Sequence, residues 1–440
     1  MDAEQPSTAK KGKPTRKRRK KQRVQEEERT PETESREEKE SSVQGQRQYT
    51  RTRKIRLYPT EEHRKVFNEW FGTTRWSYNQ MVDGLRKNRF QPKAGRVFET
   101  TLRRLYQGQK VFKNTDLSWV LRTPQEIRDT AVQDFTRGMK AAFTNKREGN
   151  IDKFAMRFRS KRKLRQESLQ IRKRMWNAKR SVITKLFRTN GILSMPARET
   201  LPEIMEHDSK LVRTNTGKYY LCLTDQLTVH DSQVDRMHGG IALDPGVRTF
   251  MTGYSPDGHT IEIGTNASQH VYGINDEISE IQALQDSHTI SRRTRRNLVR
   301  RLRRLRERGK HQIDDLHKKT AKYLCENYQV VILPPFKSGA MSRRTKKRKI
   351  GKKIVRGMLT LSHCRFRERL VQKSEQYTGC RVILSAEPYT SKTCTRCGYL
   401  NNVGSAKTLD CKACFLRLDR DVNGARNILH HYLSVNNILP

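Results

Sequence analysis

Four of the eight cysteines stand in two close pairs, and their spacing constrains the local fold more tightly than any other feature of the sequence. The pairs Cys394/Cys397 and Cys411/Cys414 form the pattern C-x₂-C-x₁₃-C-x₂-C. Two such pairs supply four thiolates in the tetrahedral arrangement that structural zinc prefers, whereas a redox-active dithiol needs only one pair. The sequence therefore predicts one structural Zn²⁺, which has no catalytic role because four sulfurs leave no open position. We expect the isolated cysteines to be small buried apolar residues: Cys222, Cys325, Cys364 and Cys380.

The composition points to a polyanionic partner. The chain has 440 residues, and its 92 Lys and Arg outnumber 46 Asp and Glu, which gives a formal net charge of +46. No apolar run approaches the roughly 20 residues that a membrane-spanning helix needs, and the N-terminus lacks the apolar stretch of a secretory signal. We therefore expect neither a membrane protein nor a secreted protein. The natural partner for this charge is nucleic acid.

Most of the basic excess lies outside the first 50 residues. That segment has 14 Lys or Arg and 10 Asp or Glu, so the other 390 residues keep a net charge of +42. Within it, residues 10–23 hold ten basic side chains and residues 26–40 are rich in Glu, without apolar periodicity. We predict a disordered tail. Its basic run is typical of a nuclear-localisation signal or of a nonspecific RNA-binding arm, and the former leads us to expect a nuclear location.

Two basic clusters in the body are candidate nucleic-acid-binding segments. Residues 291–310 contain eleven Lys or Arg and a single acid. Leu298, Leu302 and Leu305 follow helical spacing, which predicts a helix with one apolar stripe. We expect its remaining, basic surface to bind the phosphates of a nucleic acid; the alternative is a plain surface helix. Residues 342–353 form a second basic run, which we interpret as a loop that orders on nucleic acid or as a second import signal. The candidate binding residues are Arg292, Arg293, Arg295, Arg296, Arg300, Arg303, Arg304, Lys346, Lys347, Arg348 and Lys349.

The order of the predicted elements indicates a multidomain α/β protein. The chain opens with a strand at 51–58 and a helix at 61–87, for which Thr60 is the expected N-cap. A helix at 124–145 and strands at 181–187, 211–214 and 218–223 follow, and these strands suggest a small β-barrel or sheet. Later, strands at 241–244, 249–254, 260–263, 330–333 and 381–385 alternate with helical patterns at 273–327, 358–377 and 422–433. Strands separated by helices, with acids at strand ends, suit an α/β nuclease sheet.

Two acids at the ends of these elements are candidate metal ligands. Asp244 ends an apolar strand, and Asp421 lies near the start of the last predicted helix. Alone each is a weak signal, because an Asp before a helix is more often an N-cap than a ligand. Phosphodiester hydrolysis by two Mg²⁺ ions, roughly 3.5–4 Å apart, needs three or more carboxylates that converge. The strand order makes both acids candidates for such a site.

Several motifs together resemble the TnpB proteins of bacterial transposons and, more closely, their eukaryotic and giant-virus relatives, the Fanzor proteins. The resemblance covers about residues 51–433. Its longest motifs are residues 389–398, where the cysteine module begins, and residues 419–427, where the last helix begins. Shorter matches occur at 54–59, 75–79, 158–161 and 240–246. These proteins are RNA-guided DNA endonucleases with a RuvC-type (RNase H-like) nuclease domain.

The resemblance implies a multidomain α/β architecture. It consists of a RuvC-type nuclease domain with an inserted zinc ribbon, a small β-barrel wedge domain and a helical recognition domain. The implied division is a tail at 1–50, a wedge strand at 51–60, a recognition domain at 61–157, a wedge barrel at 158–238, a nuclease domain at 239–389 and 419–440, and a zinc ribbon that binds target nucleic acid at 390–418. The implied partners are a guide RNA and double-stranded target DNA, bound by a monomer that carries one RNA.

The resemblance also implies catalytic roles for three acids. Asp244 matches the first acid of the family and Asp421 the last. The middle acid departs from the bacterial pattern, in which the second nuclease strand ends in Glu, because here that strand runs into Pro334, which cannot bind a metal. Fanzor proteins carry a relocated Glu, and Glu387, at the end of the neighbouring predicted strand, fits that place. We therefore expect Asp244, Glu387 and Asp421 to hold two Mg²⁺ ions, with Asp244 bridging both.

The activity so implied is Mg²⁺-dependent cleavage of double-stranded DNA that matches the guide RNA and lies next to a short flanking motif. Two alternatives stay open on the sequence alone. The Pro334 departure also suits an RNA-guided DNA-binding protein without nuclease activity. A guide-free zinc-ribbon protein that binds nucleic acid would account for the cysteines and the charge.

Overall fold

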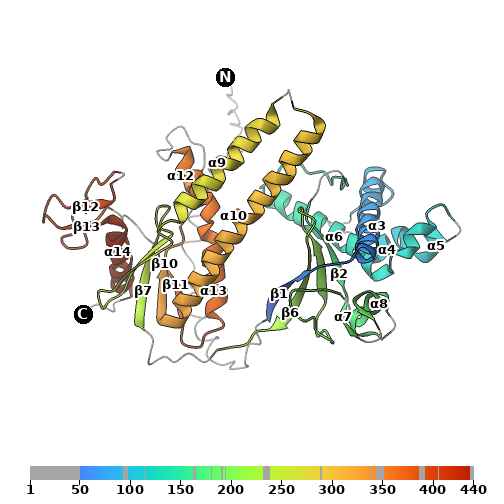
Figure 1. The fold of residues 1–440 in the computed structure, drawn as a ribbon, viewed down its shortest axis with the longest axis horizontal. Helices are drawn as coiled ribbons and strands as arrows, with labels where there is room; N and C mark the ends of the chain where they lie inside the picture. The colour runs from blue at the N-terminus through green and yellow to red at the C-terminus, as the bar shows by residue number, and fades with distance from the viewer. Residues whose placement is uncertain are drawn as a thin grey trace, which may run out of the picture. The chain divides into compact units, whose positions relative to one another are not determined.

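Two larger sheets organise the helices of the described chain (Figure 1). The tail, the candidate residues Lys346, Lys347, Arg348 and Lys349, and the candidate acid Glu387 lie outside the described residues. None of the described helices is long and apolar enough to cross a membrane. The computed structural model describes residues 50–92, 98–113, 115–161, 165–179, 181–189, 192–193, 195–230, 238–287, 290–336, 338–342, 351–385, 392–404 and 406–436.

The first sheet has four antiparallel strands in the order β1-β6-β5-β2. Buried and half-buried residues alternate along β6, which places Tyr219, Leu221 and Leu223 on one face. Among the described strands this sheet is open, with β1 and β2 at its edges, so barrel closure stays a prediction. The strands are β1 (Thr50–Leu57), β2 (Glu167–Ile171), β5 (Ser209–Arg213) and β6 (Tyr219–Gln226), and a separate ribbon consists of β3 (Arg188–Thr189) and β4 (Ile192–Leu193).

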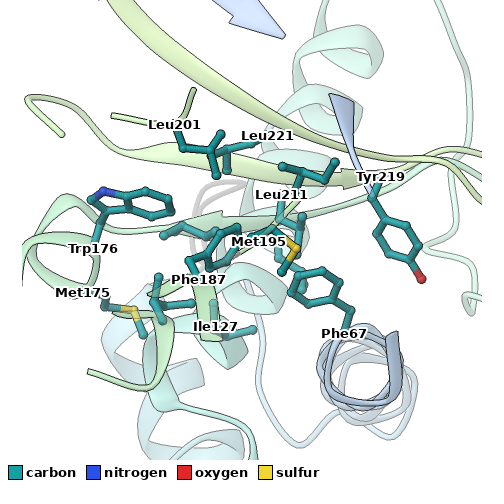
Figure 2. Close-up of a cluster of buried hydrophobic side chains, with 14 of the residues drawn as sticks. Phe67, Ile127, Met175, Trp176, Phe187, Met195, Leu201, Leu211, Tyr219 and Leu221 are labelled. Atoms are coloured by element: carbon teal, nitrogen blue, oxygen red, sulfur yellow. The ribbon is translucent and has the colours of Figure 1, made fainter. Parts of the chain in front are cut away.

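An aromatic-rich core lies against the buried face of this sheet (Figure 2). The ring centroid of Phe67, on α3 (Glu61–Arg86), is 5.5 Å from that of Tyr219 and 6.1 Å from that of Phe187. Trp176, on α7 (Lys173–Asn177), packs on Phe187 at a centroid distance of 5.0 Å. All four side chains are buried. Because aromatic side chains bury large apolar areas, these contacts hold α3 and α7 on the sheet.

Residues 181–187 form a helix, α8 (Val182–Phe187), so the predicted strand is wrong. Ser181 accepts a hydrogen bond from the backbone N–H of Thr184 at 3.0 Å, which is the contact of an N-cap. Ile183 and Phe187, four residues apart, are both fully buried in the core. The β-branched residues favoured a strand, but the cap and the helical spacing of the buried residues prevailed.

Helices α3 and α6 (Gln125–Arg147) pack against each other next to this sheet. Helix α3 begins after the predicted N-cap Thr60, whose side chain accepts a hydrogen bond from the His63 backbone N–H. Met81 of α3 and Phe135 of α6 are buried in one shared cluster. The short helices α4 (Glu99–Tyr106) and α5 (Gln109–Phe112) and the 3₁₀ turn η1 (Ser118–Arg122) complete this part.

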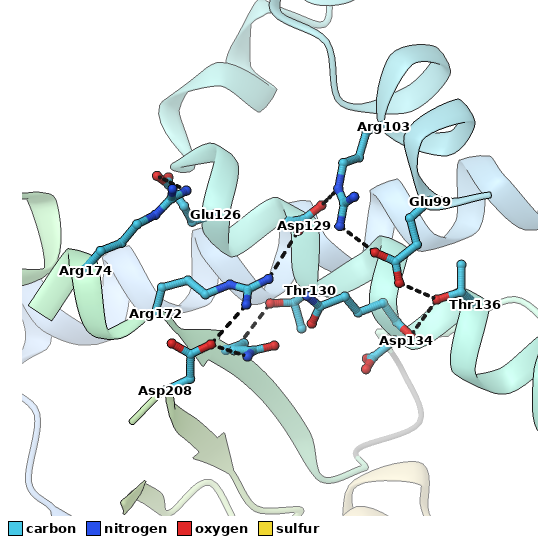
Figure 3. A network of polar contacts seen from close by, with 12 residues as sticks. Glu99, Arg103, Glu126, Asp129, Thr130, Asp134, Thr136, Arg172, Arg174 and Asp208 are labelled. Atoms are coloured by element: carbon cyan, nitrogen blue, oxygen red, sulfur yellow. Dashed lines mark hydrogen bonds and ion pairs between the residues drawn. The ribbon is translucent and has the colours of Figure 1, made fainter. Parts of the chain in front are cut away.

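Ion pairs connect α4 and α6 with the segment after β2 (Figure 3). Arg103 Nε lies 2.6 Å from Asp129 Oδ1, and Arg172 lies 3.7 Å from Asp129 and 3.0 Å from Asp208. Desolvation acts to raise the pKa of Asp208, but hydrogen bonds from the Lys173 backbone N–H and from Arg172 lower that pKa overall. Acids therefore neutralise the arginines of this network, which is typical of a structural role.

The second sheet has five strands in the order β11-β10-β7-β8-β9. Strands β7 (His238–Pro245), β8 (Met251–Tyr254) and β9 (Thr260–Ile263) form an antiparallel meander. On the other side of β7, β10 (Tyr328–Leu333) is parallel to β7, and β11 (Arg381–Leu384) is parallel to β10. A meander extended past its first strand by two parallel strands is the strand order of an RNase H-like fold. The described sheet therefore agrees with the predicted α/β nuclease fold.

Helices cover both faces of the second sheet, as the alternation along β7 requires. Ile241 and Leu243 pack with residues of α10 and α13, whereas Ala242 packs with Ile428 of α14. Because side chains alternate along a strand, Asp244 lies on the same face as Ala242, toward α14. The helices are α9 (Ala267–Asp286), α10 (Arg292–Asn327), α11 (Ser338–Ser342), α12 (Lys352–Leu361), α13 (His363–Ser374) and α14 (Arg420–Val435).

Two details of this part differ from the predictions. The helix predicted at 358–377 is interrupted at Ser362, whose left-handed φ of 52° ends α12 and starts α13. No Gly or Pro marks this break, so the apolar periodicity alone did not reveal it. Among the isolated cysteines, Cys325 and Cys380 are buried and Cys222 is half-buried. Cys364 is exposed, so the prediction that it is buried is wrong. Cys364 occupies the first turn of α13, on the solvent side of the helix.

Two buried histidines pack beside the second sheet, and we expect them to make its stability depend on pH. His317 and His363 are 0% and 2% exposed and both stack on Phe250, with centroid distances of 5.2 and 5.0 Å. Burial lowers the pKa of each histidine from 6.5 to about 4. Between those pH values the unfolded chain binds protons that the folded chain excludes, so the free energy of unfolding falls as the pH is lowered.

We expect each histidine to remove about 2–3 kcal/mol of stability at pH 4.5 relative to pH 7. Urea unfolding of the wild type and of His363→Phe at the two pH values measures this loss. The variant keeps an aromatic ring against Phe250 but has no titrating group, so it should lose less stability on acidification. An equal loss in both proteins would contradict the prediction.

Candidate active site and cysteine cluster

Asp244 lies where β7 ends, at one edge of the second sheet. It is half-buried and pairs across the strands with Thr252 of β8. Because β7, β10 and β11 run parallel, their carboxyl ends meet at this edge. Ligands in open α/β sheets commonly bind outside the carboxyl ends of the strands. The strand backbone, rather than a loop, therefore positions Asp244.

Asp421 lies in the first turn of α14, and it is not the N-cap of that helix. The N-cap is Asp419, whose Oδ1 accepts hydrogen bonds from the backbone N–H groups of Asp421 at 2.8 Å and Val422 at 3.3 Å. The Asp421 carboxylate lies 3.5 Å from Arg420 Nε and its side chain is 19% exposed. Capping therefore does not explain the acid at this position, which leaves it available as a ligand.

Gly424 brings the start of α14 against Asp244. A Cβ atom at this position would lie 2.4 Å from Asp244 Oδ2 and 3.2 Å from its Cγ, so any larger residue would displace the carboxylate. Asp421 precedes Gly424 by about one helical turn. The structure therefore brings Asp244 close to the N-terminal part of α14, and the positive N-terminal end of a helix favours nearby carboxylates.

The third candidate acid, Glu387, lies outside the described residues. Strand β10 ends at Leu333, one residue before Pro334. Strand β11 ends beside it, with Leu384 opposite Leu333 in the parallel register. The chain that leads to Glu387 therefore leaves β11 at the edge where Asp244 lies.

The two cysteine pairs converge on one point. Their Sγ atoms all lie within 4.8 Å of one another, and this is the one group of three or more candidate metal-binding side chains found among the described residues. The Sγ atoms of Cys394 and Cys414 are 3.6 Å apart, and those of Cys397 and Cys411 are 3.5 Å apart. Zinc bound to four sulfurs at about 2.3 Å gives sulfur–sulfur distances of about 3.8 Å. The cluster thus fits a zinc ion.

Both cysteine pairs adopt the same turn. The Gly398 N–H donates to the Cys394 carbonyl at 2.9 Å, and the Phe415 N–H donates to the Cys411 carbonyl at 3.0 Å. Gly398 and Phe415 have left-handed φ values of 76° and 59°. Gly398 could be recognised in the sequence as a turn residue, but a phenylalanine in this conformation could not, since bulky residues rarely adopt it.

Hydrogen bonds favour the thiolate form of Cys411, one of the four cysteines of the cluster. Desolvation acts to raise the pKa of Cys411, but the backbone N–H groups of Cys414 and Ala413 and the side chain of Asn401 lower it to about 6. A metal-bound cysteine is a thiolate, so this environment suits metal binding. The hairpin β12 (Thr408–Asp410) and β13 (Arg417–Asp419) supports the second pair and leads directly into α14.

Two asparagines join the cysteine cluster to α14. Asn423 Nδ2 and Asn427 Nδ2 both donate to the Thr393 carbonyl, at 2.8 and 2.7 Å. The Thr395 backbone N–H donates to Asn423 Oδ1 at 3.0 Å. Asn423 lies two residues after Asp421 and is completely buried. The motif at 419–427 therefore also fixes the first cysteine pair to the helix that carries Asp421, a role that sequence reasoning missed.

Asn423→Ala should loosen this connection. It leaves the Thr395 N–H without its amide acceptor, and a buried unsatisfied polar group costs about 1–3 kcal/mol. We expect zinc to pass to a chelator faster than from the wild type, as a colorimetric zinc indicator would show. Asn436→Ala is the matched control at the exposed end of α14, where the Asn436 side chain donates a hydrogen bond to the Tyr432 carbonyl of the same helix at 2.8 Å. Equal release rates for the two variants would contradict the proposed connection.

Helix α10 carries the predicted arginine-rich surface. Leu302 and Leu305 pack against Ile278 and Ile281 of α9, so the predicted apolar stripe is confirmed (Figure 1). In contrast to the network of Figure 3, none of the candidate arginines forms an ion pair with a described acid. They are exposed, apart from half-buried Arg303, and comprise Arg292, Arg293, Arg295, Arg296, Arg300, Arg303 and Arg304. Like charges on one helix repel each other, so this surface suits a polyanion.

Two of the shorter motifs, at 75–79 and 158–161, meet in the structure. Asn79 Nδ2 donates to the Arg159 carbonyl at 2.9 Å, and the Arg159 N–H donates to Asn79 Oδ1 at 2.7 Å. The Arg159 guanidinium lies 3.8 Å from the Tyr78 ring centroid and 2.9 Å from Asp134. These contacts tie the irregular segment that follows α6 to α3. Their sequence signal was the paired motifs at 75–79 and 158–161, but the pairing itself requires the fold.

Comparisons with known proteins agree with one another. Residues 363–428 match the family described as "Cas12f1-like, TNB domain", and residues 49–91 match the family described as "Helix-turn-helix domain". A "Putative transposase" of Paramecium bursaria Chlorella virus 1 is 29% identical over 402 residues, covering 87% of each chain. A "TnpB-like protein" of Acanthamoeba polyphaga mimivirus is 28% identical over 392 residues, covering 86% of this chain and 72% of the relative.

A more distant relative and a solved structure also align with the chain. A "Putative RNA-guided DNA endonuclease" of Streptomyces pristinaespiralis is 24% identical over 397 residues, covering 87% of this chain and 89% of the relative. The cryo-EM structure of a Cas12f1–sgRNA–target DNA complex contains a chain that is 13% identical. The alignment covers 87% of this chain and 98% of that chain, with a TM-score of 0.41.

Proposed function

Since this chain belongs to the TnpB/Fanzor-type family, we propose that it is an RNA-guided, Mg²⁺-dependent DNA endonuclease. It would cleave double-stranded DNA that matches a bound guide RNA and lies next to a short flanking motif, with a single RuvC-type active site. The observation that carries this proposal is the close approach of Asp244 to Gly424, about one helical turn after Asp421 on α14. The relative named as an RNA-guided DNA endonuclease supports the same activity.

Asp244, Glu387 and Asp421 would hold the Mg²⁺ ions, because carboxylate oxygens are the hard ligands that Mg²⁺ prefers. Bound Mg²⁺ would supply an activated water and stabilisation of the leaving oxygen. The chain itself holds the carboxylates in place and supplies a favourable electrostatic potential around them. Strand β7 fixes Asp244, Asp419 caps α14 so that Asp421 can face the site, and the end of the helix offsets the repulsion between carboxylates.

Chain length permits Glu387 to act as the third ligand. Strands lie about 4.8 Å apart, so β11 is roughly 10 Å from β7, and three extended residues after Leu384 span up to about 10 Å. A side chain that ends beside the Pro334 position could therefore approach the metal ions that Asp244 holds. Glu387 would then replace the acid that is missing at position 334. We therefore favour cleavage over the nuclease-inactive alternative.

The remaining parts would bind the nucleic acids. The α10 arginines would contact phosphates, and base pairing with the guide would read the target sequence, while the protein reads the flanking motif. We assign the four-stranded sheet to a wedge domain, α3–α6 to a recognition domain and the cysteine cluster to a target-binding zinc ribbon. The protein would act as a monomer with one RNA, in the nucleus, to which the basic run at 10–23 would direct it.

The decisive experiment is to purify the chain with its RNA, sequence that RNA, and offer matched DNA with Mg²⁺. We expect one defined RNA species and cleavage that depends on the match. Specific binding without nicking, unchanged by Asp244→Ala, would establish the nuclease-inactive alternative. A heterogeneous RNA pool would favour the guide-free zinc-ribbon protein.

A further inference from the structure

We propose that a groove between α9, α10 and α12 binds one unpaired nucleotide of the guide RNA. This inference rests on the proposed RNA binding, but the site includes neither the candidate catalytic acids nor the arginines at the start of α10. The groove encloses a cavity of about 370 Å³. Pockets for small ligands typically measure roughly 300–1,000 Å³, so one nucleotide can be accommodated.

The floor of the groove is apolar. Ile274 and Ile278 of α9, Ile313 of α10 and Leu359 of α12 line it. Gly309 allows α9 to approach α10 here, because a Cβ atom at that position would lie 3.3 Å from Ile274 Cγ2. Leu359 is 50% exposed although it borders buried isoleucines. A partly exposed apolar platform of this kind suits the face of a nucleobase.

The rim of the groove is basic. Arg306 and Lys310 lie one turn apart on α10, and Ile313 follows three residues later on the same face. Arg356 of α12 donates a hydrogen bond to Ser279 Oγ of α9, which holds its guanidinium across the groove. None of the three cations forms an ion pair with a described acid, and no described lining residue is Asp or Glu. Three cations that form no ion pair with a described acid, beside an apolar floor, suit the phosphate of a nucleotide.

The wall of the groove offers groups that can bind the edge of a base. Asn275 Nδ2 lies 3.3 Å from Thr360 Oγ1, and both residues line the cavity. Amide and hydroxyl groups can both donate and accept hydrogen bonds, as a base edge requires. A fourth basic residue, Arg365, is already paired with Asp314 at 3.4 Å and so contributes less to phosphate binding.

These groups favour an unpaired RNA nucleotide over other occupants. An apolar peptide would bring no anion to the three cations of the rim, and a base within a duplex cannot present its face to the floor. Proteins read RNA mainly at unpaired bases that they stack and hydrogen-bond. The guide RNA is the partner that stays bound throughout, which makes it the occupant we assign.

Photo-crosslinking from position 359 tests the assignment on the purified RNA complex. A photoreactive amino acid replaces Leu359, and the same residue at Val435, 67% exposed on α14, is the control. We expect position 359 to crosslink to one unpaired RNA nucleotide and position 435 to give no such single product. Crosslinks to target DNA, crosslinks scattered along the RNA, or no crosslink at position 359 would overturn the proposal.

Charge variants give a second, independent readout. Lys310→Gln and Arg356→Gln should each reduce the slope of log K for RNA binding against log salt concentration by about one, as the loss of one phosphate contact predicts. Together they should reduce the yield of the crosslink at position 359. Lys319→Gln is the matched control on α10, because Lys319 is already paired with Asp315 at 2.9 Å. Indistinguishable effects of Lys310→Gln and Lys319→Gln would overturn the pocket. A wild type that cleaves matched DNA but fails these tests refutes only the pocket, whereas a wild type without a defined RNA refutes the proposed function as well.

Discussion

Replacing Asp244 by asparagine is expected to reduce Mg²⁺-dependent cleavage by about a thousandfold or more, which corresponds to about 4 kcal/mol of transition-state stabilisation. The amide has nearly the shape of the carboxylate, so the packing of residue 244 against Gly424 should persist. The charge that metal binding requires is lost. Asp421→Asn should have the same effect for the same reason. Single-turnover cleavage of matched DNA by the purified RNA complex measures both.

Asp419→Asn is the matched control for this pair of variants. It lies two residues from Asp421 and makes the same chemical change, but its side chain caps α14, a role that asparagine fulfils as well as aspartate. We expect Asp419→Asn to cleave within a few-fold of the wild type, and all three variants to bind RNA normally. Normal cleavage by Asp244→Asn would refute its role as a metal ligand. If Asp419→Asn were as inactive as Asp421→Asn, the loss of cleavage would reflect disruption of the start of α14 rather than loss of a metal-binding carboxylate.

The parts of the fold that the sequence predicted are those in which local pattern and tertiary packing agree. The stripe of Leu302 and Leu305 defined α10, and the cap Thr60 marked the start of α3. The failures occur where they disagree. Residues 181–187 have β-branched side chains, but a serine cap and core packing make them helical. The break at Ser362 depends on a left-handed residue that no Gly announces.

The candidate site was predictable only in part, because a sequence motif identifies residues but does not show which other residues lie next to them in the fold. Spacing was enough to group the four cysteines, and the strand end was enough to single out Asp244. Neither could show that Gly424 leaves room for the Asp244 carboxylate, since the two are 180 positions apart and meet only when α14 packs on β7. Likewise, the basic rim of the α9–α10–α12 groove combines residues whose common location only the tertiary structure reveals. Glu387 remains a prediction from resemblance.

The cysteine cluster is expected to control cleavage although it contains no candidate catalytic group. Structural zinc sites of this type contribute about 10–16 kcal/mol of apparent binding free energy, which is largely folding free energy. Without zinc, the segment around Thr393 would lose its order, and Asn423 and Asn427 would lose the carbonyl to which they donate. Because Asp421 lies on the same helical turns, its position would become less defined. A displacement of about 1 Å at a catalytic group can cost about a hundredfold in rate.

We therefore predict that Cys411→Ser lowers the zinc content well below one ion per chain and reduces cleavage by about a hundredfold. Cys364→Ser is the matched control, because Cys364 is exposed on α13 and lies outside the cluster. Zinc content is measured by elemental analysis and cleavage by single-turnover assay. RNA binding should be largely preserved in both variants, since the α10 surface does not depend on the cluster. If Cys411→Ser lost zinc but cleaved matched DNA at the wild-type rate, the connection from the cluster through Asn423 to Asp421 would be refuted, and the cluster would serve DNA binding alone.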